Sequence, residues 1–251
     1  MTTLRLLSYN VRSMRDDVDA LARVMREIAP DVAIIQEAPR FLRWRSKCAA
    51  LARRAGMVGV TGGRASGANL VLSSLAVQVL DTHELAFTAD RHLHHRGAAV
   101  AVLKLAGARF AVAGTHLDLI EEPRLRHLDE LAAFAARTLP RDAPLIVGGD
   151  LNAVPSSATW QRMQLFGTDA FAAVGVGDGF TYSTRAPVRR IDGVFADSRV
   201  RPVKAETIDS ADVRIASDHR PLVVEYLLPE TGTGTETDAG TNAGTGANTN
   251  A

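Results

Sequence analysis

The hydrophobic pattern of this chain alternates between short apolar runs, typical of buried strands, and longer segments with apolar residues at helical spacing. The short runs predict strands near residues 4–11, 31–37, 57–60, 69–73, 76–81, 144–150, 180–182, 190–196, 199–208 and 220–228. Residues 96–116 are typical of a β-hairpin that turns at Ala106 and Gly107.

Helical spacing is clearest over residues 16–28, where the apolar positions are Val18, Leu21, Val24, Met25 and Ile28. Asp16 or Asp17 is placed to cap this helix, and Pro30 ends it. Further helices are expected over residues 41–55, 122–138 and 157–165. Strand–helix–strand units with added hairpins in both halves predict an α/β sandwich of two sheets.

The domain organisation follows from where the apolar residues stop. Residues 1–228 form one predicted domain, and residues 229–251 contain almost nothing apolar larger than alanine. Such a segment cannot offset the entropy lost on ordering, so we expect a disordered tail.

Composition narrows the class of protein. The chain has 251 residues, 46% of them hydrophobic, and a formal net charge of +1. Without the tail's three acidic residues the body carries about +4, which permits a phosphorylated partner without requiring one. Cys48 is the single cysteine, so an intramolecular disulfide is excluded. With no apolar run of about 18–20 residues, we expect a soluble cytoplasmic protein that does not enter a membrane.

Polar side chains stand at the ends of six predicted strands. They are Asn10, Glu37, His116, Asp150 with Asn152, Asp192, and Asp218 with His219. Carboxylates, carboxamides and imidazoles gathered at one edge of a sheet suit a hard divalent cation and a phosphate ester. The pattern therefore predicts one site assembled from all six strand ends.

The residue types suggest separate roles within that site. Glu37 is the first candidate for a Mg²⁺ ligand, completed by Asn10 and Asp218. Asp150 suits orientation of a water, and Asn152 suits donation to a phosphoryl oxygen, although both residue types also favour an Asx turn. His219 requires a carboxylate to set its tautomer.

Asp192 is the candidate partner of His219, whose role as base or as phosphate stabiliser stays open. In the cluster of His92, His94 and His95, a solvated loop is favoured over a zinc site, because no cysteine lies nearby. The basic segment 40–47, with Trp44 interleaved, suits a nucleic-acid backbone but is equally typical of a solvated helix face.

The segments SYNV, IIQE, GTHLD, GGDLN, RRIDGVF and SDHRP occur in this order and resemble the endonuclease/exonuclease/phosphatase superfamily over residues 4–228. The resemblance implies a four-layer α/β/β/α sandwich of two packed mixed β-sheets flanked by helices. It also implies that Glu37 and Asn10 lie at the metal, that Asp192 pairs with His219, and that His116 contacts the scissile phosphate.

Three further positions are implied as substrate-binding residues, namely Arg96, Asp118 and Thr181. Asp118 is equally typical of a loop residue that caps the following helix. Arg220 departs from the small or apolar residue that DNA-repair members of this superfamily often carry, which weighs against an abasic-site endonuclease.

Together these features predict a metal-dependent hydrolase of phosphate esters, a phosphodiesterase of endonuclease or exonuclease type, that uses Mg²⁺ or Mn²⁺ as its substitute. A small-molecule phosphatase acting on an inositol phosphate or a similar compound is the alternative on the same site. A binding module without catalysis is the alternative of another class. The expected partners are a phosphate ester and, as one option, nucleic acid, and the expected state is a monomer.

Overall fold

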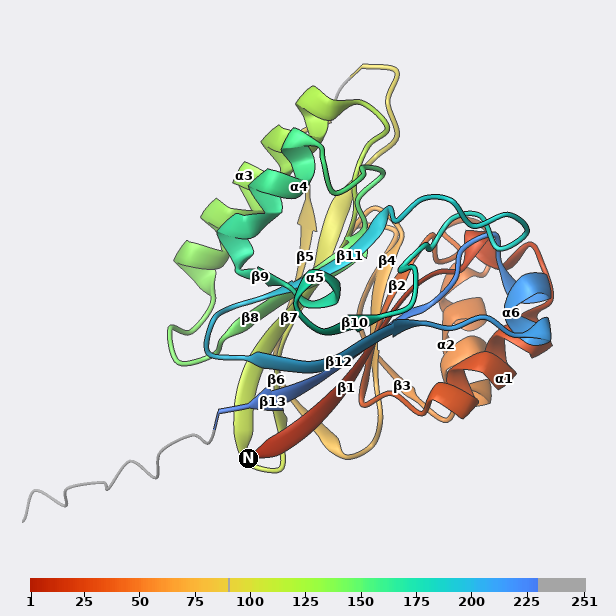
Figure 1. Cartoon of the computed structure of the whole chain (residues 1–251), viewed down its shortest axis with the longest axis horizontal. Coiled ribbons are helices and arrows are strands. Elements are labelled where there is room, and N and C mark those ends of the chain that lie inside the picture. Colours follow the sequence, from red (N-terminus) through yellow and green to blue (C-terminus); the bar gives the residue numbers. More distant parts are fainter. Residues whose placement is uncertain (90, 230–251) are drawn as a thin grey trace, which may run out of the picture.

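Two stacked β-sheets form the centre of the molecule in the computed structural model, which describes residues 1–89 and 91–229 (Figure 1). The first sheet has the order β10 (Gly175–Val176), β12 (Arg201–Thr207), β13 (Leu222–Leu228), β1 (Thr2–Asn10), β2 (Val32–Gln36), β4 (Asn69–Ser73) and β3 (Val58–Gly63). The second has the order β5 (Val77–Ala86), β6 (Gly97–Leu105), β7 (Ala108–His116), β8 (Leu145–Asp150), β11 (Asp192–Ala196) and β9 (Thr168–Asp169).

Helices cover the outer face of each sheet. The described helices are α1 (Val18–Ile28), α2 (Trp44–Arg54), α3 (Glu121–Thr138), α4 (Ala158–Met163), α5 (Ala170–Val174) and α6 (Ala211–Ala216), with 3₁₀ turns at Arg12–Met14 and Gln164–Phe166. Helices α1, α2 and α6 lie on one side of the molecule and α3 and α4 on the other (Figure 1). The four-layer α/β/β/α sandwich is therefore confirmed.

The apolar core lies in three layers that follow the strand period of two. Side chains such as Leu4, Ile34 and Phe110 are fully buried between the two sheets. The alternate positions of the same strands, such as Leu7 and Ile35, pack instead beneath α1 and α2. Central strands buried on both faces account for the nearly continuous apolar runs seen in the sequence.

Most element boundaries agree with the predicted ones. Asp17 caps α1 by accepting a hydrogen bond from the backbone N–H of Ala20 at 2.8 Å. Helix α2 starts three residues later than expected, because Arg43 takes a left-handed φ of 58° immediately before it. The predicted strand over residues 180–182 was wrong, since only isolated bridges of Tyr182 to Arg189 and His219 form there. Helix α6 was not predicted.

Two other expectations concern the C-terminal tail and membrane-spanning segments. The predicted disordered tail lies outside the described residues, apart from Pro229. In the described ranges, no helix combines the length and the apolar character needed to cross a membrane.

Close approach of the sheets depends on Gly114 in β7. A methyl group added there would lie 2.5 Å from Cγ2 of Ile34 on β2 in the opposite sheet. We expect Gly114→Ala to lower the free energy of unfolding by about 1–3 kcal/mol through overpacking. Urea unfolding of Gly114→Ala alone and in an Ile34→Ala background measures this, because removing Cγ2 makes room and reduces the added cost. Equal costs in both backgrounds would contradict the contact.

Cys48 provides an independent test of the packing of α2. Its side chain is 6% exposed, and burial raises the pKa of the thiol to about 11. At pH 8 roughly one thiol in a thousand is then ionised. We expect native protein to react with a disulfide reagent on the order of a hundredfold more slowly than urea-unfolded protein, and faster as pH rises towards 11. Rapid labelling of native protein at pH 8 would contradict this burial.

Candidate active site

Four of the predicted site residues are the inward-facing positions at one end of their strands, namely the last residue of β1, β7 and β8 and the first residue of β11. The inward rows run Leu4, Leu6, Ser8, Asn10 on β1; Phe110, Val112, Gly114, His116 on β7; Ile146, Gly148, Asp150 on β8; and Ala196, Val194, Asp192 on β11. His116 is the register partner of Asp150, which is also the partner of Asp192. The pleat that directs apolar side chains into the core thus directs these polar groups to the mouth between the sheets.

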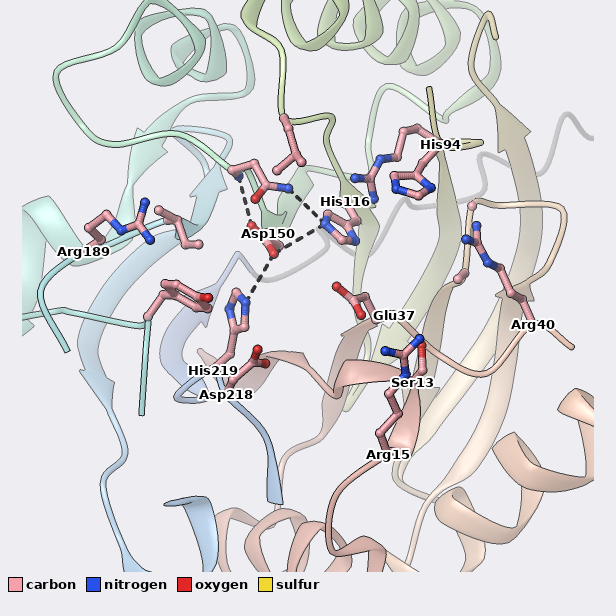
Figure 2. A pocket seen from close by; sticks show the side chains of 17 residues that line it. Ser13, Arg15, Glu37, Arg40, His94, His116, Asp150, Arg189, Asp218 and His219 are labelled. Atoms are coloured by element: carbon pink, nitrogen blue, oxygen red, sulfur yellow. Dashed lines mark hydrogen bonds and ion pairs between the residues drawn. The ribbon is translucent and has the colours of Figure 1, made fainter. Parts of the chain in front are cut away.

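A single carboxylate, that of Asp150, lies at the centre of the site (Figure 2). Asn10, from the opposite sheet, donates through Nδ2 to Asp150 Oδ2 at 3.0 Å and is 3.2 Å from Glu37 Oε1. Glu37 takes a φ of 51° at the end of β2, which ends the strand and leaves the side chain lining the pocket. One carboxamide therefore holds two carboxylates from two different sheets near each other.

The chain turns sharply after Asp150. The backbone N–H of Asn152 donates to Asp150 Oδ1 at 3.0 Å, which is the Asx turn considered as the alternative reading of this pair. Asn152 has a φ of 48°, and its Nδ2 lies 3.0 Å from both Nε2 of His116 and the carbonyl oxygen of Leu117. The Asx turn is therefore part of the site, because it directs the amide of Asn152 into the pocket.

His219 and Asp192 form the predicted pair. Nδ1 of His219 donates to Asp192 Oδ2 at 2.9 Å, and its Nε2 lies 3.6 Å from Asp150 Oδ2. Burial opposes protonation of His219, but the charges of Asp192 and Asp150 outweigh it and raise the pKa of His219 to about 10. The imidazole is therefore a cation at neutral pH.

His116 has the opposite electrostatic character. Burial lowers the pKa of His116 to about 3, against the opposing charge of Asp150. A neutral ring also fits its hydrogen bond, because Nε2 accepts from the amide of Asn152. The Asp150 carboxylate therefore lies between a cationic histidine and a neutral one.

The remaining predicted positions fall into two groups. Asp218 and Arg96 line the same pocket as Glu37, and Asp218 is paired with Arg12 at 3.3 Å. Asp118 and Thr181 lie behind the pocket wall, with side chains almost wholly buried. Direct substrate contact is therefore not expected from either.

Both buried residues support neighbours instead. Asp118 lies 3.7 Å from Arg96 and accepts a hydrogen bond from the N–H of Ile120, which forms a turn just before α3. The capping role considered for Asp118 was wrong, because Ile120 is the N-cap residue of α3 and no described side chain caps it. The hydroxyl of Thr181 accepts from the backbone N–H groups of Ile191 and Asp192, which fixes the start of β11.

The metal-ligating side chains that lie closest together in the described part of the chain are Asp150, Asp192 and His219, whose ligand atoms lie within 4.8 Å of one another. This group differs from the predicted set of Glu37, Asn10 and Asp218, which stays a prediction. Asp192 is 1% exposed and already accepts a hydrogen bond from His219 Nδ1. We interpret the compact group as a hydrogen-bonded chain that orients His219 towards Asp150.

Sequence reasoning missed several residues of the pocket, which has a volume of about 610 Å³. They are Ser13, Arg15, Arg40, His94, Tyr182 and Arg189. Arg189 and its neighbour Arg190 have different surroundings, because Arg190 binds Asp169 at 2.9 Å while Arg189 lies over the ring of Tyr182. His94 and Arg40 belong to segments that the sequence analysis noted but did not assign to this site. The others lie in loops or short turns without a periodic pattern, so the sequence carried no signal that would place them here.

Arg220, the departure noted in the sequence, has a structural contact. Its guanidinium donates to Asp209 at 2.6 Å, and its backbone N–H donates to the carbonyl of Thr181. It therefore holds the segment before β13 in place and does not line the pocket.

Fold and site together define an α/β sandwich with an acidic, histidine-containing pocket at the mouth between its sheets. A family model described as the endonuclease/exonuclease/phosphatase family matches residues 7–219, so the chain belongs to that family, whose members are phosphoesterases. No curated protein sequence matches the chain.

Solved structures share the fold at low sequence identity. An endonuclease/exonuclease/phosphatase from Bacteroides vulgatus is 18% identical with a TM-score of 0.75, covering 91% of this chain and 100% of its own. A mannosyl-6-phosphatase from Bacteroides thetaiotaomicron is 14% identical with a TM-score of 0.76, covering 90% and 100%. D. rerio TDP2, complexed with a single-strand DNA product, is 18% identical with a TM-score of 0.71, covering 90% and 100%.

A buried arginine outside the predicted set connects the two loops that carry His116 and Asn152. Arg124 of α3 donates through Nη1 to the carbonyl oxygens of Leu119 at 2.9 Å and Asn152 at 3.1 Å. Its Nε donates to Thr159 Oγ1 at 2.9 Å. The guanidinium fork reaches several acceptors at once, which a lysine ammonium on a flexible stem cannot reproduce.

We expect Arg124→Lys to lower kcat for phosphate ester hydrolysis by about tenfold to a hundredfold, because small displacements of reacting groups are costly. KM is expected to change little, since Arg124 does not line the pocket. Steady-state kinetics measures both, with Arg137→Lys on the exposed part of the same helix as the matched control. A loss in Tm with unchanged kcat would show that Arg124 is only structural.

Proposed function

We propose that this protein is a metal-dependent phosphoric ester hydrolase that cleaves a phosphodiester with an activated water. The observation that carries this proposal is the environment of Asp150. Its carboxylate is held by Asn10 and the Asn152 backbone, and it lies within 3.6 Å of both His116 and His219. A carboxylate fixed this precisely beside a cationic imidazole suits in-line attack on a phosphate.

Asp150 is the candidate for orienting the attacking water. Each of its oxygens accepts one hydrogen bond from the protein, at Oδ1 from Asn152 and at Oδ2 from Asn10. A carboxylate oxygen has a second acceptor site, so Asp150 can still accept a proton from a water in the pocket.

Cationic and amide groups surround the expected position of the phosphate. His219 carries a positive charge at neutral pH because its pKa is raised to about 10, which favours a role in stabilising phosphate oxygens over a role as general base. Arg96 lines the same pocket and adds a guanidinium. The Nδ2 group of Asn152 also lies there, but it directs its two hydrogens at His116 and Leu117, so it would reach a phosphoryl oxygen only by giving up one of these bonds. Preorganised donors of this kind stabilise the charge that develops on the phosphoryl oxygens.

The residues present fit a hard divalent cation such as Mg²⁺ or Mn²⁺. Glu37 and Asp150 place two carboxylates beside Nδ2 of Asn10, and Asp218 lines the same pocket. Oδ1 of Asn10 accepts from the backbone N–H of Arg12 and keeps a second lone pair for a cation. Oxygen donors with only one or two carboxylates are typical of Mg²⁺ sites. Glu37, Asn10 and Asp218 would hold the cation, which when bound supplies positive charge to a phosphate oxygen and to the leaving group.

A small-molecule phosphatase is the second candidate. The pocket volume of about 610 Å³ lies in the range of sites for small ligands, and Arg15, Arg40, Arg96 and Arg189 give it a basic rim. One protein of the same fold is a mannosyl-6-phosphatase, which supports testing sugar phosphates.

A substrate panel with Mg²⁺, Mn²⁺ and EDTA tests the proposal. The panel contains single-stranded DNA, plasmid DNA, RNA, bis-p-nitrophenyl phosphate, inositol phosphates and mannose 6-phosphate. We expect hydrolysis of at least one phosphodiester, its loss in EDTA, and its recovery with added Mg²⁺. Hydrolysis of the monoesters alone would favour the small-molecule phosphatase.

Asp150→Asn keeps the shape of the side chain and removes its charge. We expect it to lower kcat by about 10²–10⁴-fold, the usual effect of removing a general base. Glu37→Gln is expected to raise the Mg²⁺ concentration required for half-maximal rate, because it removes one proposed ligand. Glu27→Gln on the exposed side of α1 is the matched control. Activity of Asp150→Asn within tenfold of wild type would reject the assignment.

A further inference from the structure

A second hollow lies beside the catalytic pocket and is not used by the proposed chemistry. It has a volume of about 730 Å³, and its walls include Arg40, Phe41, Trp44, Arg45, Arg64 and His95. These six residues, called here the Trp44 hollow, come from the segment before α2, the first turn of α2, the β3–β4 turn and the loop before β6.

The Trp44 hollow adjoins the catalytic pocket. Arg40 lines both. The two walls also follow each other along the chain, since His94 lines the catalytic pocket and His95 the hollow. Figure 2 shows Arg40 and His94 on one side of the catalytic residues, opposite Arg189. A substrate that extends past Arg40 would therefore enter the hollow.

Two aromatic rings of the hollow, those of Trp44 and Phe41, have specific contacts. Trp44 packs its ring edge on Gly63, where an added methyl group would collide with the ring. The guanidinium of Arg45 lies 4.4 Å from the Trp44 ring centroid, and that of Arg40 lies 5.4 Å from Phe41, which is 73% exposed. Phe41 and its neighbour Leu42, which is 83% exposed, together place an apolar surface in solvent beside these guanidinium groups.

The charge of the hollow favours an anion. Arg40, Arg45 and Arg64 form no ion pair with any carboxylate in residues 1–89 and 91–229, and Glu84 is the one acidic residue among the described lining residues. Elsewhere the arginines of this protein are commonly paired, as Arg23 is with Asp212 at 2.7 Å. Unpaired guanidinium groups beside aromatic faces are suited to phosphate and to planar bases.

We propose that the Trp44 hollow is a nucleotide-binding subsite, which takes the base and phosphate next to the scissile phosphate of a single-stranded nucleic acid. The base stacks on the aromatic wall of Trp44 and Phe41. The neighbouring phosphate pairs with Arg45 and Arg64. This proposal rests on the proposed function in one respect, because it places the strand's scissile phosphate at Asp150.

Binding without turnover tests the subsite directly. Fluorescence anisotropy of a labelled short oligothymidylate is measured with the full chain in EDTA. We expect Trp44→Leu and Arg45→Gln each to weaken binding about fivefold or more, the effect of losing one base stack or one phosphate contact. Arg53→Gln, the same charge change at an exposed position of α2, is the control and is expected to bind as wild type does.

Trp44 is partly buried, so its variant also requires a folding check by circular dichroism and Tm. Arg45 is exposed, and its variant keeps the test decisive if Trp44→Leu fails to fold. Oligothymidylate is further expected to quench the tryptophan fluorescence of the wild type. The chain has two tryptophans, and because Trp160 is only 4% exposed, this quenching would report on Trp44. Unchanged oligothymidylate affinity in a folded Arg45→Gln protein would overturn the subsite.

Hydrolysis separates the subsite from the proposed function. In Mg²⁺, we expect Arg45→Gln to lower the ratio of kcat/KM for oligothymidylate to kcat/KM for bis-p-nitrophenyl phosphate about fivefold or more. Weakened binding in EDTA without hydrolysis of any substrate would reject the proposed function and retain the subsite.

The same surface could instead contact an anionic membrane through its exposed apolar residues. Sedimentation with phosphatidylserine vesicles tests this. If Arg45→Gln loses vesicle binding while its affinity for oligothymidylate is unchanged, the nucleotide assignment is overturned. If vesicle binding is absent in the wild type and oligothymidylate binding is lost in the variant, the subsite is supported.

Discussion

The face-to-face packing of the two sheets is the contact on which the rest of the structure depends. Alternate residues of β1, β2, β7, β8 and β11 fill the space between the sheets with side chains that are almost fully buried. Burial of that apolar surface is the main favourable term in folding such a domain. It also fixes the register of each strand, because a shift of one residue would exchange the two faces.

The site is an extension of the same packing. Asn10, His116, Asp150 and Asp192 occupy the next inward positions after the apolar rows end, so the core determines where they point. Buried polar groups require partners, and here most of them bond to one another, although Oδ1 of Asp192 has no hydrogen-bond partner among the residues that the structure describes. The bond from Asn10 to Asp150 is the clearest case, since it joins a residue of each sheet at 3.0 Å.

The backbone conformation of two site residues turns the chain just after a strand and directs a side chain into the pocket. Glu37 and Asn152 both take left-handed φ angles, one and two residues after the end of a strand, and both side chains line the pocket. Such conformations cost about 1–3 kcal/mol each and persist only where the surroundings hold them. The carbonyl of Asn152 is held by Arg124, while that of Glu37 accepts from the N–H of Ser13. Residues outside the catalytic set thus maintain its geometry.

The sequence by itself determined the period-two strands, the main helices and the polar residue at each strand end, because these follow from local pattern and chain chemistry. It could not place Arg124, Arg189 or the Trp44 hollow. These residues lie on helices and loops that are separate in the sequence, and they meet only through the arrangement of the sheets. Nor could it decide the charge of the two histidines. Burial keeps His116 neutral and two neighbouring carboxylates keep His219 charged, and such environments exist only once the chain has folded.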